Sequence, residues 1–320
     1  IWRKGPDGPE TLLQIDARGA VTGVNGHVDL GTGLRTALIQ IVAEELDLPP
    51  GQVTMVMGDT ARTPDQGPTI ASESIQIAAV PLRQAAAQAR HILGLRASAR
   101  LNAAPDELRF ADGRVASAQG QVTLAELLAG PPERAELDPG VPVKAPADYR
   151  LVGTTTPRVD IAGKATGAWS YVHDVRLADM LHGHVIRPPY AGRDSGDFIG
   201  RSLLGFDEAA VAGMPGFVAV VRLGDFLGVV AEREGQAREI ARALPVQWAT
   251  PPDLPDLSDI PGTLRDLPST PRLLQDRGDV DGALDRAATR LTRSYVWPWN
   301  LHGSIGPSCA VAHWQGDRLV

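Results

Sequence analysis

The order of hydrophobic and polar residues in the first part of the chain predicts strands that alternate with helices. Residues 11–25 alternate apolar and polar positions around a central Ala-Arg-Gly turn, which predicts a β-hairpin. Residues 34–46 repeat apolar side chains at helical spacing: Leu34, Leu38, Ile41, Val42 and Leu46, with Glu44, Glu45 and Asp47 outside the stripe. A Pro-Pro-Gly sequence at 49–51 ends this helix, and the β-rich residues 53–57 follow it.

A long alanine-rich segment, residues 72–103, predicts a second helix. Pro81 interrupts it, so the helix either kinks at Pro81 or begins there with Pro81 as its first residue. Short β-like runs are expected within 107–122, and a short helix at 123–129.

Residues 131–148 contain five prolines and lack strong periodicity, which predicts a linker between domains. A second unit of helices and strands follows, with strands expected at 181–187, 217–222, 226–232 and 245–249 and a helix at 234–244. Residues 250–275 form another connection rich in Pro and Asp. A helix near 279–289 and strands near 291–298 and 308–314 are expected to open a third unit.

Composition and charge narrow the function classes. The chain has 320 residues, which is enough for two domains, and its 43% hydrophobic and 22% charged residues exclude global disorder. A net charge of -7 argues against nucleic acid or an anionic membrane as the main partner. No apolar run has the length of a membrane span. The single cysteine, Cys309, excludes an internal disulfide, a cysteine-ligated iron–sulfur cluster and a Cys-rich zinc site in this chain.

Both ends of the chain predict a piece of a longer functional unit. Ile1 is not Met, no targeting segment follows it, and residues 317–320 have the pattern of a strand that has just begun. The cellular compartment stays open.

The strongest motif is a glycine turn that runs directly into the first predicted helix, at residues 26–36 (GHVDLGTGLRT). Such a turn directs backbone N–H groups and a helix N-terminus toward one point, where an anion is stabilised. A second loop of this kind lies at residues 67–74 (GPTIASES), and the pair suggests one large anionic ligand. Neither loop has the P-loop pattern of a nucleotidase or the glycine fingerprint of a Rossmann dinucleotide site.

Each candidate residue in these loops also has a structural interpretation. The loop around Thr32 can be a tight strand-to-helix turn, and the hydroxyl-bearing residues near Ser72 can form a helix cap. Arg35 and Arg62 are the nearest cations. His27 and Asp29 stand two apart, but without a third ligand a structural strand pair is favoured over a metal site.

Three stretches together resemble the large molybdenum-binding subunit of the xanthine dehydrogenase and aldehyde oxidase family, in its nicotinate dehydrogenase and isoquinoline 1-oxidoreductase β-subunit form. Residues 26–36 are similar to that family's glycine loop, and residues 67–74 to its second cofactor loop. Residues 158–167 (RVDIAGKATG), with 174–177, 180–183 and 187–189, are similar to the opening of its α/β hammerhead domain. Residues 228–232 and the helix after them continue that likeness.

This resemblance implies an α+β fold in five parts. Residues 1–130 would be part of a molybdopterin-binding domain, and residues 149–250, after the linker at 131–148, an α/β hammerhead domain. Residues 251–275 would connect it to the start of a further molybdopterin-binding portion at 276–320.

The resemblance also implies the ligand and the residues that hold it. The cofactor would be molybdenum–molybdopterin cytosine dinucleotide, contacted by Gly31, Thr32, Gly33, Leu34, Arg35, Thr69, Ala71, Ser72 and Ser74. Pterin sulfurs and oxo or sulfido groups would hold the metal, so no protein metal ligand is expected. The Gln that is frequent in the family at the position of Thr32 is absent here.

The activity implied is that of an oxidoreductase, a molybdenum hydroxylase that oxidises an N-heteroaromatic or aldehyde substrate with oxygen from water. Electrons would pass to iron–sulfur clusters on a separate small subunit, and the remainder of the molybdenum subunit would be a further partner. The alternative is a non-catalytic scaffold or binding protein that keeps the fold.

No catalytic residue is expected in this chain, because the family's general base is a glutamate in a late glycine-rich motif that these residues lack. Glu73 and Glu232 are therefore not assigned that role. Residues 297–309 (WPWNLHGSIGPSC) are similar to a family segment with His and Glu-Pro, but Gly306 stands in place of the glutamate. That replacement argues against a purine substrate. The alternative for this segment is a buried edge strand with a core thiol at Cys309.

Overall fold

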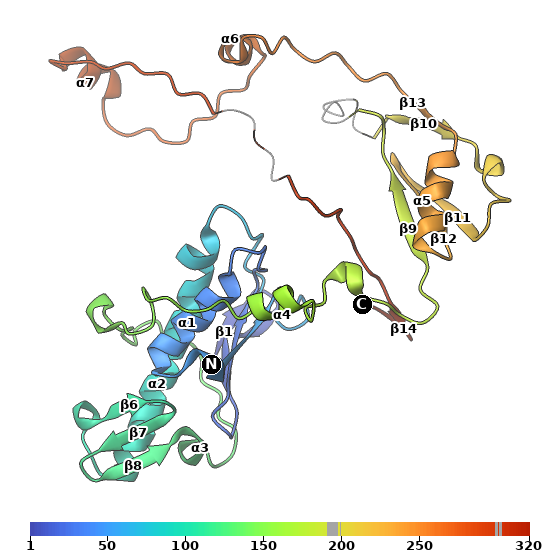
Figure 1. The fold of residues 1–320 in the computed structure, drawn as a ribbon. Coiled ribbons are helices and arrows are strands. Elements are labelled where there is room, and N and C mark those ends of the chain that lie inside the picture. Colours follow the sequence, from blue (N-terminus) through green and yellow to red (C-terminus); the bar gives the residue numbers. More distant parts are fainter. Residues whose placement is uncertain (191–197, 199, 298–299, 301–302) are drawn as a thin grey trace. The chain divides into compact units, whose positions relative to one another are not determined.

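The computed structural model describes residues 1–190, 198, 200–297, 300 and 303–320. The chain forms two compact units, Ile1–Trp169 and Ser170–Val320, each built from helices and strands (Figure 1). The predicted mixture of helix and sheet is confirmed. No helix within the described ranges is long and apolar enough to span a bilayer.

A strand–helix–strand crossover forms the centre of the first unit. Strands β3 (Leu13–Ile15) and β4 (Val21–Asn25) form the predicted antiparallel hairpin, and β5 (Val53–Met57) pairs parallel with β4. Helix α1 (Leu34–Leu46) makes the connection that two parallel strands require. The hairpin of β1 (Trp2–Gly5) and β2 (Gly8–Thr11) precedes this sheet and was not predicted.

The second helix begins neither at Pro81 nor at residue 72. A π-helical turn at Ser74–Ala78 runs into α2 (Ala79–Leu101), so that Pro81 occupies the first turn of α2. Proline has no N–H to donate to the preceding turn, and the π-helical turn stands where that α-helical hydrogen bond would form. Side chains from α1, α2 and the sheet fill the core, among them Leu13, Val21, Leu38, Val42 and Leu82.

A three-stranded antiparallel meander covers the far end of α2, as the β-like runs within 107–122 predicted. Its strands are β6 (Arg109–Ala111), β7 (Arg114–Ser117) and β8 (Gly120–Thr123). The short helix α3 (Leu124–Leu127) follows, and Thr123 and Glu126 form a reciprocal cap at its start.

The chain after the meander stays on the first unit up to Trp169. The predicted linker at 131–148 therefore does not separate the compact units, whose boundary falls between Trp169 and Ser170. The physical reason is tertiary: buried acidic residues of α1 accept hydrogen bonds from Lys144 and from the amides of residues 150–152. Helix α4 (Ile161–Thr166), which was not predicted, lies in this segment. The molybdopterin-binding and hammerhead assignments of the domains stay predictions.

The second unit contains a three-stranded antiparallel sheet covered by one helix. Its strand order is β11 (Phe217–Leu223), β12 (Phe226–Ala231) and β9 (His182–Ile186), and α5 (Glu234–Ala243) packs on β9 and β12. The predicted strands 181–187, 217–222 and 226–232 and the helix 234–244 are confirmed within one or two residues. Strand β13 (Val246–Trp248) pairs with β10 (Leu203–Phe206), which was not predicted.

The last part of the chain carries less regular structure than predicted. It contains α6 (Ile260–Asp266), α7 (Val280–Arg286) and a hairpin of β14 (Trp314–Gln315) and β15 (Arg318–Leu319). The described residues of 291–298 and of 308–313 form no strand, and Cys309 is exposed, so the edge strand and core thiol expected there are wrong. β-Rich composition alone does not make a strand without a hydrogen-bonded neighbour.

Candidate functional site

The first glycine loop binds a carboxylate from its own sequence. Asp29 accepts hydrogen bonds from the amides of Gly31 at 2.9 Å, Gly33 at 3.2 Å and Arg35 at 3.0 Å. Burial raises the pKa of Asp29, but the three N–H donors outweigh burial and hold the pKa below its ordinary value. The backbone N–H groups of the loop therefore bind the chain's own Asp29 carboxylate, and the predicted contact with a ligand phosphate stays a prediction.

The other predicted residues of this loop differ in whether their polar groups are free to bind a ligand. Thr32 is exposed, and within the described structure neither its amide nor that of Leu34 donates to a protein group. The Arg35 side chain donates to the carbonyl of Met55 at 2.6 Å and is thereby held against β5. Thr32 is consequently the residue of this loop best placed to meet a ligand.

Gly31 and Gly33 have left-handed backbone conformations, with φ of 93° and 84°. These angles favour glycine because a Cβ would crowd the following carbonyl. At Gly31 a Cβ would have no heavy atom within 4 Å, whereas at Gly33 it would lie 3.3 Å from Arg158. Over the described ranges, the space beside Gly31 is therefore free of protein atoms, whereas Arg158 occupies the space beside Gly33.

The second predicted loop lies directly against the first. The amide of Val28 donates to the Thr69 hydroxyl at 2.9 Å, and the amide of Gly26 donates to the side-chain oxygen of Gln66 at 2.7 Å. Residues 41 and 40 positions apart in sequence are therefore in contact. The expectation of one site built from two loops agrees with this placement, while ligand contact by these residues stays a prediction.

A buried histidine joins the two loops. His27 is 1% exposed, with Nδ1 2.7 Å from the Ser74 hydroxyl and Nε2 3.1 Å from the Gln66 carbonyl. Since a carbonyl only accepts, Nε2 carries the proton, and the Ser74 hydroxyl donates to Nδ1 when the ring is neutral. His27 and Asp29 thus serve structure, and no cluster of three potential metal ligands occurs in the described ranges.

Two residues at the tip of the second loop have an unusual backbone. Ala71 and Ser72 are consecutive, exposed and left-handed, with φ of 52° and 61°. This conformation costs a residue with a side chain about 1 kcal/mol or more. A strained, exposed pair of this kind is typical of a loop shaped for a contact.

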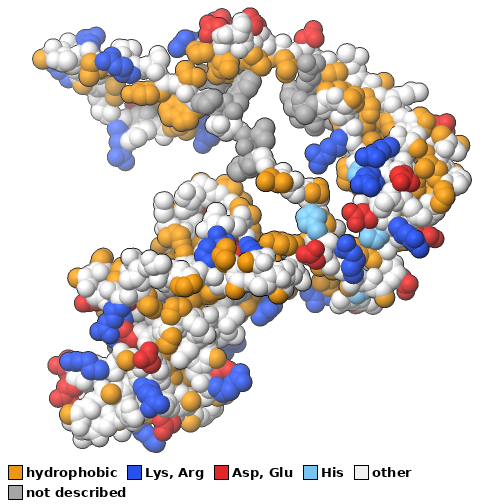
Figure 2. Space-filling model, in the orientation of Figure 1, with side chains coloured by type: hydrophobic (Ala, Val, Ile, Leu, Met, Phe, Trp, Pro, Cys, Tyr) orange, Lys and Arg blue, Asp and Glu red, His pale blue; other side chains and the backbone are white. Residues whose placement is uncertain are grey.

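A pocket of about 440 Å³ adjoins the second loop. His27, Gln66, Glu73, Gln76 and Gln84 supply polar groups to it, and Ile77, Ala78, Val80 and Pro81 supply an apolar wall. Ile77 and Val80 are 60% and 47% exposed, and Figure 2 shows other hydrophobic side chains on the visible surface of both units. Glu73, which the sequence does not assign as a general base, lines this pocket.

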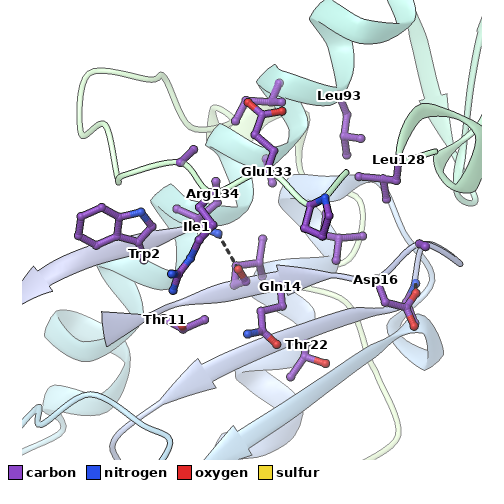
Figure 3. A pocket seen from close by; sticks show the side chains of 18 of the residues that line it. Ile1, Trp2, Thr11, Gln14, Asp16, Thr22, Leu93, Leu128, Glu133 and Arg134 are labelled. Carbon is purple, nitrogen blue, oxygen red and sulfur yellow. Dashed lines mark hydrogen bonds between the residues drawn. The ribbon is translucent and has the colours of Figure 1, made fainter. Parts of the chain in front are cut away.

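A second pocket, of about 680 Å³, is lined by other residues (Figure 3). It lies beside the hairpin of β3 and β4, where the Ile1 amine donates to the Leu13 carbonyl at 2.7 Å. Gln14, Thr22 and Arg134 line it as well. Since none of its residues comes from the two glycine loops, it is not the predicted site.

Arg62, one of the two cations named for the loops, makes only a surface contact. Arg62 is exposed and lies 3.8 Å from Asp59, which is an ordinary surface pair. Of residues 297–309, positions 298, 299, 301 and 302, which include His302, lie outside the described residues. Gly306 and Cys309 are exposed.

We expect Asp29→Asn to lower the free energy of unfolding of the first unit by about 1–2 kcal/mol, because an amide replaces a charged acceptor of three N–H donors. Urea titration measures the change. Asp65→Asn is the matched control, since Asp65 accepts from one loop amide only, that of Gly67. Equal losses in the two variants would contradict a special role for Asp29.

Sequence and structure comparisons place these loops in a known family. Residues 2–173 match the model of the molybdopterin cofactor-binding domain. The chain is 56% identical over 310 residues to a nicotinate dehydrogenase subunit of Pseudomonas putida, covering 96% of this chain and 26% of that protein. It is 27% identical to the beta subunit of isoquinoline 1-oxidoreductase of Brevundimonas diminuta, covering 77% of this chain and 36% of that protein.

Solved structures give a partial match. Quinoline 2-oxidoreductase from Pseudomonas putida 86 is 30% identical, with a TM-score of 0.33, over 36% of this chain and 15% of that one. The chain thus spans about a quarter of the first curated relative and a smaller share of the solved structure.

Proposed function

The chain belongs to the molybdopterin cofactor-binding domain family, and from this premise we propose that it forms one wall of the molybdenum-cofactor site of a hydroxylase. The resemblance to nicotinate dehydrogenase and isoquinoline oxidoreductase subunits is confirmed by the two curated relatives. The observation that carries the proposal is the direct bonding of the two glycine loops, both of which lie within the matched residues 2–173.

Among the described residues, the second loop and Thr32 have free polar groups for a phosphate-bearing cofactor, whereas the amides of Gly33 and Arg35 do not. Thr32 offers an amide N–H and a hydroxyl, Thr69 and Ser72 offer hydroxyls, and the space around Gly31 and Gly67 is open. The amides of Gly33 and Arg35 do not fit a phosphate, because the Asp29 carboxylate already accepts from both. We therefore assign the contacts to Thr32 and the second loop, in place of the full set Gly31–Arg35.

The roles of the residues in the proposed site follow from their chemistry. The molybdenum centre, when bound, would supply the two-electron redox step. Thr32, Thr69 and Ser72 would orient the polar part of the cofactor, with the cytosine dinucleotide form as our specific proposal. Ala71 and the apolar wall of Ile77 and Val80 would exclude water beside it. Ser74 would act indirectly, because its hydroxyl is bound to His27.

The remaining predictions about the whole protein are proposals of the same kind. We propose an N-heteroaromatic or aldehyde substrate, an α/β hammerhead domain beginning in the second unit, and an iron–sulfur subunit that accepts the electrons. The names of the curated relatives, subunits of nicotinate dehydrogenase and isoquinoline 1-oxidoreductase, support the substrate class and a partner subunit. The hammerhead domain is supported by the family likeness of residues 158–189 alone.

The test is purification of the complete complex that contains this chain, followed by metal analysis and pterin fluorescence. We expect molybdenum and pterin in equal amounts, and dye reduction that depends on an N-heterocycle or aldehyde. Residues 1–320 alone are expected to show no hydroxylase activity. A complex free of molybdenum would overturn the proposal and favour the non-catalytic scaffold.

A further inference from the structure

Arg158 contacts the first glycine loop at a carbonyl group, whereas Asp29 binds the amides of the loop. The Arg158 Nη1 donates to the Gly31 carbonyl at 3.0 Å, although 127 residues separate the two in sequence. Asp29 binds the amides of the loop, so together Asp29 and Arg158 hold both the donors and an acceptor of the same short segment. A loop held in this way has few conformations left to lose when a ligand binds.

The Arg158 guanidinium is itself held by a buried carboxylate. Nε and Nη2 donate to the two oxygens of Asp160 at 3.0 and 2.6 Å, the bidentate arrangement that arginine forms with carboxylates. Lys164 from α4 donates to the same carboxylate at 2.5 Å. The Asp160 side chain is 5% exposed, so its charge is fixed in place by these two cations.

The backbone beside Arg158 is fastened to α1. The Val159 amide donates to the Thr36 hydroxyl at 3.1 Å, in the first turn of the helix that follows the glycine loop. Further along α1, Gln40 donates to the Leu151 carbonyl at 3.2 Å and to the Thr156 hydroxyl at 2.9 Å. These hydrogen bonds hold the segment 151–160 along α1 and thereby place Arg158 beside the loop.

We propose that Arg158 is a positioning residue for the cofactor, which holds the loop at Gly31 so that Thr32 stays exposed and oriented. The role of Arg158 in cofactor binding rests on the proposed function, whereas the contact of Arg158 with the Gly31 carbonyl does not depend on it. Arg158 acts through the loop carbonyl and not by contact with the reacting atoms.

The test compares three variants of the complete complex with one control variant. In Arg158→Ala, molybdenum content is expected to fall roughly five-fold, because a charge-assisted hydrogen bond to the loop is lost. Arg158→Lys should recover part of it, since lysine keeps the charge but loses the bidentate geometry. Asp160→Asn keeps Arg158 but removes the charge that orients it, and should lower the content in the same direction. Arg62→Ala, an exposed arginine in the same unit, is the control.

Amide hydrogen exchange supplies a readout that needs no cofactor. In Arg158→Ala the amides of Gly31 and Gly33, which donate to Asp29, should exchange roughly three-fold faster, while those of α2 stay unchanged. A general loss of stability of the first unit would speed exchange of both the loop amides and the α2 amides.

Two results would overturn different parts of the inference. Normal molybdenum content and unchanged loop exchange in Arg158→Ala and Asp160→Asn would overturn the role of Arg158. Absence of molybdenum from the wild-type complex would instead overturn the proposed function, and the exchange result would still decide whether Arg158 holds the loop.

Discussion

Replacement of Glu44 by glutamine is expected to lower the free energy of unfolding of the first unit by about 3–5 kcal/mol, the range for removing one partner of a buried charged network. Glu44 is 2% exposed. Its Oε2 accepts the amides of Arg150 at 2.9 Å, Leu151 at 2.6 Å and Val152 at 3.0 Å. A glutamine keeps one oxygen: if it faces these three amides, its NH2 group meets the Lys144 ammonium, and in the opposite orientation the NH2 group faces the amides, so donors stay unpaired either way.

The same carboxylate connects stability to pH. Burial raises the pKa of Glu44, but the amides of Leu151, Val152 and Arg150 and the ammonium of Lys144 together lower it below the ordinary value. A depressed pKa stabilises the fold fully above the unfolded pKa, which is about 4.3 for glutamate. The contribution is lost as pH falls from there through the folded pKa. In Glu44→Gln the stability should therefore fall less steeply below about pH 4.

Urea unfolding monitored by far-ultraviolet circular dichroism at a series of pH values measures both effects. Glu136→Gln is the matched control, because the Glu136 side chain is exposed on the same unit. Its stability is expected to stay within about 0.5 kcal/mol of wild type. A Glu44 variant as stable as the control would show that residues 150–152 do not depend on this carboxylate.

Glu44 also shows where sequence reasoning reached its limit. The spacing of Leu34, Leu38 and Val42 predicted α1 correctly, because one face of a helix must be buried. The same spacing placed Glu44 and Glu45 outside the buried stripe, yet both are buried. Their partners, Lys144 and Arg83, come from distant segments, as the 2.7 Å contact of Arg83 with Glu45 illustrates. A periodic pattern reports what a helix buries locally and carries no information about such partners.

Local sequence predicts some parts of the candidate site and not others. The two glycine loops were found from local turn chemistry, and the structure brings them together. The sequence around Arg158 indicates only a family likeness, because nothing local in the sequence links Arg158 to Gly31. Asp29 stood inside the motif, yet its capture of the loop amides depends on the turn of the backbone around Gly31. A short polar side chain just before a glycine turn is the signal that could have indicated this internal anion.

Gly26→Ala should have the largest effect on the site, with molybdenum content of the complete complex reduced by roughly ten-fold or more. A Cβ at this position would overlap with the Pro64 carbonyl oxygen and lie 3.2 Å from the Gln66 nitrogen. Both obstacles are backbone atoms, which cannot swing aside as a flexible side chain does. Relief requires that the end of β4 and the loop after Pro64 move apart, at a cost of about 3 kcal/mol.

That movement would break the contacts on which the proposed site depends. The Gly26 amide donates to Gln66, and the neighbouring His27 and Val28 bind Ser74 and Thr69. Gly51→Ala is the matched control, because a Cβ at Gly51 meets no heavy atom within 4 Å and its backbone is not left-handed. Metal analysis should show normal molybdenum in the Gly51 variant. If the Gly26 variant also kept its molybdenum while folded, the joining of the two loops would not be what binds the cofactor, since this substitution separates them directly.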